Sequence, residues 1–183
     1  MVIQGHRKTF ILVAVIFILP VLLAKLALEM GWFNRASTNN GQLLEPSLDL
    51  SMLDSQHKWR LLYLLPADCD SSCENALIAI NQVWVALGRE QDRAEPVVIL
   101  TDNSDSRPRQ QLDKLTGVRL LNVAPQDVNE VFKDVPTDGI FLVDTLDNVI
   151  LRYPLQTEQQ QAVLHSRDIL ADLRKLLKLS RIG

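Results

Sequence analysis

The sequence predicts an α/β fold, in which helices cover a sheet, behind a single membrane-spanning helix. Three observations carry this prediction. An uncharged apolar run, residues 10–24, follows the polar residues His6, Arg7 and Lys8. After about residue 58, segments with the periodicity of strands and of helices alternate. Nearer the C-terminus, two short apolar segments flank a turn rich in Asp and Asn, which is typical of a hairpin.

The apolar run has the length and flanks of a transmembrane anchor. A helix that spans a bilayer needs about 20 mostly apolar residues, and this run is interrupted only by Pro20. A cleavable signal peptide has the same order of charged and apolar residues. However, no small-x-small cleavage site follows, and Trp32 and Phe33 are suited to the membrane interface. Positive charge before the span predicts a cytoplasmic N-terminus, and in a bacterium a periplasmic domain on the inner membrane.

Length and composition predict one domain behind this anchor. We expect residues 1–33 to form a cytoplasmic tip and the anchor, residues 34–54 a polar periplasmic linker, and residues 55–183 the domain. The formal net charge of −3 and the lack of a basic stripe interleaved with aromatic residues give no reason to expect nucleic-acid binding.

Each element of the domain is predicted from its own pattern. The predicted strands cover residues 59–65, 96–100, 118–123, 140–143 and 149–153, and the predicted helices cover 74–87, 110–115 and a segment from about Ser166. Gly88 suits the C-terminal end of the first of these helices. Because parallel units come first and an antiparallel hairpin follows, the order describes a thioredoxin-like three-layer sandwich.

The two cysteines of the chain, Cys69 and Cys73, lie in the predicted turn between the first strand and the first helix. Two thiols at this spacing can close a small disulfide or bind one soft metal ion. The neighbouring carboxylates of Asp68, Asp70 and Glu74 oppose thiolate formation and favour a cation. A purely stabilising disulfide is the alternative in an oxidising compartment. Its loop would be very short, so the entropic gain would be small, which favours a functional pair.

The two thiols have different expected roles. Cys73 lies near the start of a helix, where unpaired backbone N–H groups and the helix dipole lower the pKa of a thiol. Cys69 is expected to be the more exposed thiol and to attack first.

No histidine is a secure metal ligand from the sequence. His6 precedes the span, His57 is predicted at the end of the sheet opposite the cysteines, and His165 lies just before the last predicted helix. A lone histidine without a spacing partner is a weak signal. The remaining acidic and aromatic candidates are interpreted as turn residues, namely Asp102, Asp105 and Asp144, or as core, namely Trp84.

The strand that ends in a Cys-bearing turn, the helix that begins at the second Cys, and the late Gly-Ile-Phe-Leu-Val-Asp hairpin together resemble the Sco/SenC copper proteins of cytochrome c oxidase assembly. The resemblance covers residues 59–179. It implies that Cys69 and Cys73 are the two thiolate ligands of a Cu(I) ion. The distant Sco histidine has no counterpart, because residues 134–139 occupy its place, and Glu74 stands where Sco motifs usually have Pro.

The chain is also similar to a group of membrane-anchored proteins of proteobacteria that are encoded among cytochrome oxidase assembly genes. The shared segments are Leu19-Pro20, Asn40-Gly41-x-Leu43-Leu44-x-Pro46, Pro66-Ala67-Asp68-Cys69, the stretch 86–93 and the ending 177–183. This similarity implies that the partners are the inner membrane and cytochrome c oxidase subunit II or another assembly factor.

Val135-Pro136-Thr137 resembles the Val/Ile-Pro-Thr of thioredoxin-type oxidoreductases, whose proline is cis and packs against the active-site disulfide. A cis X-Pro bond costs only about 0.5 to 1 kcal/mol relative to trans. The resemblance implies that Pro136 joins Cys69 and Cys73 in a site for thiol-disulfide exchange. A plain proline between a loop and a strand is the alternative.

Three functions therefore remain open. The chain reduces the oxidised cysteines of the copper centre in subunit II, with Cys69 attacking and Cys73 resolving. Alternatively, it carries Cu(I) on both thiolates and hands it over by ligand exchange. A third hypothesis is a non-catalytic scaffold that binds oxidase subunits or a Sco protein.

Overall fold

The computed structural model describes residues 3–29, 39–108, 112, 115 and 117–180, and the chain divides into a first unit, residues 1–38, and a second unit, residues 39–183. In the first unit, helix α1 (Ile3–Glu29) contains Pro20. Its segment Thr9–Ala27 is long and apolar enough to cross a membrane, and none of it is buried in the protein. Trp32 and Phe33 lie outside the described residues.

The second unit is built on a six-stranded mixed sheet. Its strands are β1 (Gln42–Asp49), β2 (Trp59–Leu64), β3 (Ala94–Leu100), β4 (Arg119–Asn122), β5 (Gly139–Val143) and β6 (Asn148–Pro154). Their order across the sheet is β1-β6-β5-β2-β3-β4. The pairs β2–β3 and β3–β4 are parallel, whereas β5, β6 and β1 add antiparallel strands on the other side of β2. Strand β2 is therefore central, and its carboxyl end leads into the cysteine turn.

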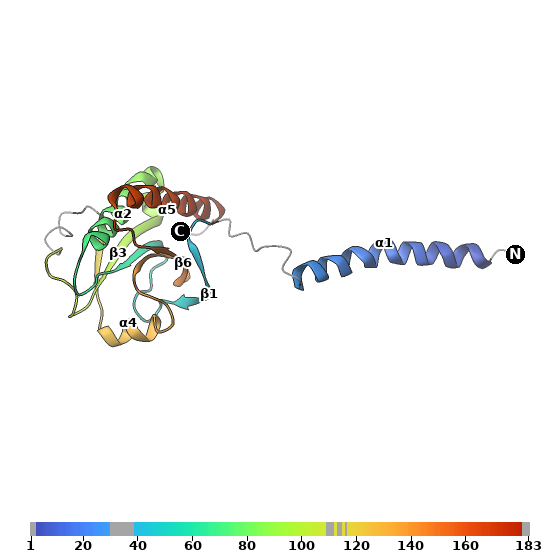
Figure 1. Cartoon of the computed structure of the whole chain (residues 1–183), viewed down its shortest axis with the longest axis horizontal. Coiled ribbons are helices and arrows are strands. Elements are labelled where there is room, and N and C mark those ends of the chain that lie inside the picture. Colours follow the sequence, from blue (N-terminus) through green and yellow to red (C-terminus); the bar gives the residue numbers. More distant parts are fainter. Residues whose placement is uncertain (1–2, 30–38, 109–111, 113–114, 116, 181–183) are drawn as a thin grey trace. The chain divides into compact units, whose positions relative to one another are not determined.

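Helices cover both faces of this sheet. Helices α2 (Ser71–Leu87) and α5 (Gln159–Leu179) pack on one face, and α4 (Pro125–Val131) packs on the other (Figure 1). Alternate residues of β2 supply the two cores: Tyr63 faces α2 and α5, whereas Leu62 joins the α4 side. This is the three-layer α/β arrangement that the sequence predicts.

The sequence prediction of a linker over residues 34–54 differs from the structure, because β1 lies inside that segment. β1 is a mostly exposed edge strand, and its pairing with β6 changes register between Leu43 and Leu48. It therefore lacks the regular apolar alternation by which a strand is recognised from sequence. The compact unit begins at Asn39, ahead of the predicted start at residue 55.

The helix boundaries differ from prediction where exposed polar residues form helical turns. Helix α5 begins at Gln159 rather than near Ser166, since its first residues, Gln159 and Gln160, are exposed and add no apolar signal. The short helix α4, with Pro125 at its start, was not predicted. Most of the predicted helix 110–115 lies outside the described residues.

A buried carboxylate holds the first residues of the second unit in place. Asp172 on α5 is 2% exposed and accepts hydrogen bonds from the backbone N–H groups of Asn40 (2.7 Å) and Gly41 (2.9 Å) and from the Tyr153 hydroxyl (2.9 Å). Four donors meet at this carboxylate, because the Asn40 side chain also donates to it. The chain that leads into β1 is thus fixed to the helical layer.

A second buried cluster lies at the amino end of β2, the end of the strand away from the cysteines. Arg60 is fully buried and donates to the carboxylates of Asp54 (3.1 Å) and Asp147 (2.5 Å). Arg119 binds the same Asp54 and also Glu95. A buried guanidinium is tolerated only when such partners satisfy it, so the cluster is a structural ion-pair network.

Candidate functional site

Cys69 and Cys73 are joined by a disulfide in the turn between β2 and α2. Their Cα atoms are 5.2 Å apart. Cys73, in the first turn of α2, is fully buried, and Cys69 keeps 8% of its surface exposed. Cys69 is therefore the more exposed of the two cysteines, as the sequence predicts.

The start of α2 is fixed by Asp70. Its carboxylate accepts hydrogen bonds from the backbone N–H groups of Ser72 and Cys73, both at 3.0 Å, as an N-cap does. A further hydrogen bond from the Ser72 hydroxyl, together with the one from the Cys73 N–H, holds the pKa of Asp70 below its ordinary value. Because the N–H of Cys73 is bound to Asp70, it is not available as a hydrogen-bond donor to the sulfurs.

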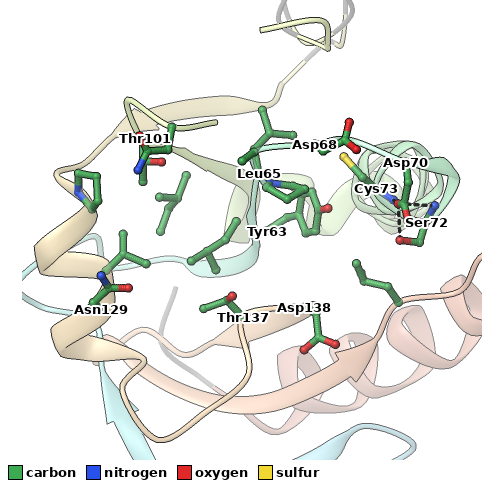
Figure 2. Close-up of a pocket in the computed structure, with 18 residues that line it drawn as sticks. Tyr63, Leu65, Asp68, Asp70, Ser72, Cys73, Thr101, Asn129, Thr137 and Asp138 are labelled. Carbon is green, nitrogen blue, oxygen red and sulfur yellow. Dashed lines mark hydrogen bonds between the residues drawn. The ribbon is translucent and has the colours of Figure 1, made fainter. Parts of the chain in front are cut away.

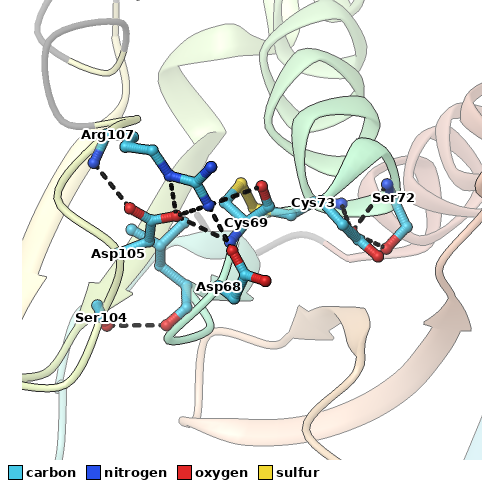
Figure 3. The surroundings of a disulfide bond; sticks show 9 residues. Asp68, Cys69, Ser72, Cys73, Ser104, Asp105 and Arg107 are labelled. Atoms are coloured by element: carbon cyan, nitrogen blue, oxygen red, sulfur yellow. Dashed lines mark hydrogen bonds and ion pairs between the residues drawn. A yellow bond between two sulfur atoms is a disulfide. The ribbon is translucent and has the colours of Figure 1, made fainter.

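Asp105 and Arg107 hold the cysteine turn from the loop after β3 (Figure 3). The Asp105 carboxylate is 8% exposed and accepts a hydrogen bond from the Cys69 N–H at 2.9 Å. Arg107 donates to the same carboxylate through Nε at 2.8 Å, and it forms an ion pair with Asp68. The hydrogen bonds from Arg107 hold the pKa of Asp105 well below its usual range. Asp105 thus stays ionised and bound to the backbone of Cys69.

A cavity of about 430 Å³ opens beside the disulfide (Figure 2). Its wall comes from β2 and the cysteine turn, the loop after β3, helix α4 and the loop before β5. The apolar lining includes Leu65, Ile99, Val128 and Leu155, and the polar lining includes Tyr63, Asp68, Asp70, Ser72, Thr101, Asn103, Asn129, Thr137 and Asp138. Cys73 belongs to the same lining.

Tyr63 is the buried polar side chain of this cavity. It is 1% exposed, and its hydroxyl has no hydrogen-bond partner among the described residues. Burial, followed by the negative charge of Asp70, raises the pKa of the phenol far above its ordinary value. The hydroxyl therefore stays protonated and is a buried donor without an acceptor in the described part of the chain.

A sequence model of the family described as "Transmembrane-like, thioredoxin-like, C-terminal domain" matches residues 59–180. The chain belongs to this family. The match begins at the first residue of β2 and ends just after α5, so it covers the cysteine turn and the cavity. The thioredoxin-like fold predicted from the sequence is thereby confirmed. No curated protein matches the chain.

Several solved structures are similar to this transmembrane-like, thioredoxin-like protein. ScoI of Bradyrhizobium japonicum with copper bound has 17% identity and a TM-score of 0.44 over 69% of this chain and 97% of that chain. ScoI of Arabidopsis thaliana with copper bound has 15% identity and a TM-score of 0.49 over 74% and 98%. A thiol:disulfide interchange protein from Bacteroides sp. has 19% identity and a TM-score of 0.49 over 78% and 92%.

The donor set of the site fits Cu(I) and does not fit a Sco-type Cu(II) site. Two adjacent thiolates, released from Cys69 and Cys73 on reduction, are soft ligands of the kind that Cu(I) prefers. Among the described residues, no group of three His, Cys, Asp or Glu side chains is placed to bind one ion. His57 is exposed before β2, and the His165 ring packs edge-on against Tyr153 with centroids 5.9 Å apart.

Pro136 does not occupy the place that the thioredoxin pattern implies. The peptide bond before it is trans, and the cis bond among the described residues precedes Pro46 instead. Pro136 is exposed and does not line the cavity, whereas the next two residues, Thr137 and Asp138, do. The cis-proline interpretation of Pro136 is therefore wrong for this structure. The stretch 134–139 still reaches the site, through these two side chains.

Sequence reasoning missed three residues that shape the site. It treated Asp105 as a turn residue and did not single out Arg107 or Tyr63. One signal was available for Asp105: the carboxyl ends of parallel strands meet at one edge of a sheet, so the loop after β3 must lie beside the cysteine turn after β2. For Tyr63 the signal was its position two residues before Leu65 on the α2 side of the strand.

Proposed function

We propose that this chain is a single-pass, membrane-anchored thiol-disulfide exchange protein that assists assembly of the copper centre of cytochrome c oxidase. Its anchor is α1 in the bacterial inner membrane, and its second unit faces the periplasm, as the positive charges before the span favour. The partner is subunit II or another assembly factor.

The observation that carries this proposal is the Cys69–Cys73 disulfide at the edge of an open cavity. A disulfide that only stabilised the fold would gain little from closing so short a loop. Here Cys73 lines a cavity of about 430 Å³, and the backbone of Cys69 is held by Asp105. That combination favours a reactive pair over a structural one.

The exchange follows from the different exposure of the two sulfurs. In the reduced protein, the Cys69 thiolate attacks a disulfide of the partner, and one partner sulfur leaves as a thiolate. The buried Cys73 thiolate then attacks the Cys69 sulfur, which re-forms the Cys69–Cys73 disulfide and releases the second partner thiolate. Two electrons pass to the partner, and a dithiol reductant of the same compartment must restore the pair.

Cu(I) handling is the second candidate function, and the two adjacent soft sulfurs favour it. In this case the reduced pair binds the ion as cargo and passes it to the thiolates of the partner by ligand exchange. The missing third ligand makes a two-coordinate Cu(I) the expected form.

The deciding experiment replaces the cysteines in the bacterium that encodes the chain. We expect Cys69→Ser, Cys73→Ser and the double variant to reduce the level of assembled, active oxidase. Ser71→Ala, which changes an exposed side chain of the same turn outside the cavity lining, is the matched control and should leave the level unchanged. If the double variant builds normal oxidase, both chemical functions are wrong and a scaffold remains.

Two further measurements separate exchange from copper handling. Cys73→Ser cannot resolve a mixed disulfide, so an exchange protein should accumulate a covalent adduct with its partner, visible on a non-reducing gel. A carrier should show no adduct. Instead, the reduced full chain in detergent should bind one Cu(I) in an anaerobic titration against a competing chelator, and the double Cys→Ser variant should not.

A further inference from the structure

Tyr63 and the disulfide share one buried environment. The side chains of Tyr63, Cys69 and Cys73 belong to the same core cluster on the α2 side of the sheet, and Tyr63 and Cys73 line the same cavity. Figure 2 shows Tyr63 beside the first turn of α2, which carries Cys73. In this oxidised state, the Tyr63 hydroxyl has no acceptor among the described residues.

The charged groups around the Cys69–Cys73 pair are bound to partners other than the Tyr63 hydroxyl. Asp68 is paired with Arg107, Asp70 caps α2, and Asp138 is paired with Arg152. Among the residues that line the cavity, all of which the structure describes, none is Lys, Arg or His. The carboxylates near the Cys73 sulfur are therefore bound to other groups, whereas the Tyr63 O–H has no hydrogen-bond partner in the part of the chain that the structure describes.

Reduction changes what the sulfur of Cys73 can offer to that O–H. A disulfide sulfur is a poor acceptor, whereas a thiol can both donate and accept, and a thiolate is a strong acceptor. A buried donor without a partner destabilises the state in which it stays unpaired. The oxidised form carries this penalty, and the reduced form can relieve it.

We propose that Tyr63 is a positioning residue whose hydroxyl pairs with the Cys73 sulfur on reduction and thereby favours the reduced dithiol. The inference deepens the proposed thiol exchange, on which it rests, because the redox equilibrium of the pair sets how readily a dithiol reductant of the same compartment restores it after each exchange. It concerns the redox equilibrium of the Cys69–Cys73 pair, which Tyr63 would influence without taking part in the exchange reaction.

The test equilibrates the full chain, in detergent, with glutathione redox buffers under argon. Two glutathione thiols form one disulfide as the Cys69–Cys73 bond breaks, and their protons end on the two cysteines. Alkylation followed by mass spectrometry counts the reduced fraction, since the chain has only two cysteines. Removal of one hydrogen bond in Tyr63→Phe should lower the equilibrium constant for reduction roughly tenfold, which is a shift of about 30 mV to a more negative potential.

The other tyrosine of the chain is the matched control. Tyr153 is also 1% exposed and belongs to the same core cluster, but its hydroxyl is bound to Asp172. Tyr153→Phe removes the same atom and should leave the equilibrium constant unchanged. The proposal is overturned if Tyr63→Phe has the wild-type constant or a larger one, or if both variants shift it equally. Failure of the cysteine variants to affect oxidase would instead refute the function and leave this equilibrium result intact.

Discussion

The Asp105 carboxylate accepts a hydrogen bond from the backbone N–H of Cys69, across 36 positions of sequence. The loop after β3 is thereby attached to the loop after β2. Because its donor is a backbone N–H, this bond does not require the sulfur of Cys69 to be in a disulfide. Arg107 completes the attachment by bonding both Asp105 and Asp68.

Asp105→Asn should loosen this attachment. The amide keeps one acceptor oxygen but loses the charge that pairs with Arg107, so the Cys69 backbone and Arg107 must compete for it. We expect a lower thermal midpoint for the full chain in detergent and a disulfide that dithiothreitol reduces several times faster. Circular dichroism and a thiol-release assay measure the two effects.

Asp102→Asn is the control for Asp105, because Asp102 is an exposed residue of the same loop. It should change neither the thermal midpoint nor the reduction rate. Equal behaviour of the two variants would show that the Asp105 hydrogen bonds do not hold the turn.

Gly41 should not tolerate a side chain. A Cβ at this position would lie 2.6 Å from the Tyr153 ring, which is itself held by Asp172. Gly41→Ala is therefore expected to destabilise the second unit by about 1 to 3 kcal/mol through overpacking. Urea denaturation of the full chain in detergent, followed by tryptophan fluorescence, measures this.

An exposed position close by gives the comparison for Gly41. Ser47→Ala changes a side chain of β1 that is exposed, so its free energy of unfolding should match the wild type. If Gly41→Ala is as stable as Ser47→Ala, the close approach of residue 41 to Tyr153 is not required by the fold.

The sequence was informative where an element is buried and periodic. Strands β2, β3 and β5 and helix α2 present apolar runs or stripes to the core, so their patterns record the packing directly. Strand β1 could not be found this way, because it is held mainly by backbone pairing with β6 and by the contact of Asn40 and Gly41 with Asp172. Backbone pairing leaves little trace in side-chain periodicity.

The candidate site shows the same division. The cysteine pair was predicted because two thiols at that spacing are rare and chemically specific. The Asp105–Cys69 contact was not, since it depends on which loops meet in space. The interpretation of Pro136 depended on a three-residue resemblance, and so short a pattern does not determine the isomer of a peptide bond.

Pro136→Ala tests whether Pro136 has the catalytic role that its resemblance to the thioredoxin-type proline implies. Since Pro136 is exposed and outside the cavity lining, we expect the level of assembled oxidase and the reduction rate of the disulfide to stay within about twofold of wild type, as for ordinary surface substitutions. Thr137→Val, which removes a hydroxyl from the cavity wall, should have the larger effect on partner trapping. A severe defect in Pro136→Ala with a normal Thr137→Val would restore the catalytic role of the proline.

Asp147, at the end of the sheet away from the cysteines, makes the stability of the second unit depend on pH. Its carboxylate accepts hydrogen bonds from the buried Arg60 and from the Ser55 hydroxyl. Burial acting alone would raise the pKa of Asp147, but these hydrogen bonds outweigh it and hold the pKa below its ordinary value. A carboxylate with a lowered pKa stabilises the folded state above its unfolded pKa of about 3.9, and this contribution is lost as the pH falls through the folded value.

Asp147→Asn isolates that charge, because the residue has a positive φ of 68°, which Asn adopts as readily as Asp. At pH 7 the variant should lose about 1 to 2 kcal/mol in the free energy of unfolding, since Arg60 keeps Asp54 as a partner. The difference from wild type should shrink as the pH falls below about 4, where this carboxylate begins to take up a proton in the unfolded chain, and should continue to shrink down to the lower pKa of the folded state. Urea denaturation from pH 7 to pH 3, with the exposed Asp102→Asn as reference, measures it. A difference that stays constant over this range would mean that Asp147 acts through its turn geometry and not through its charge.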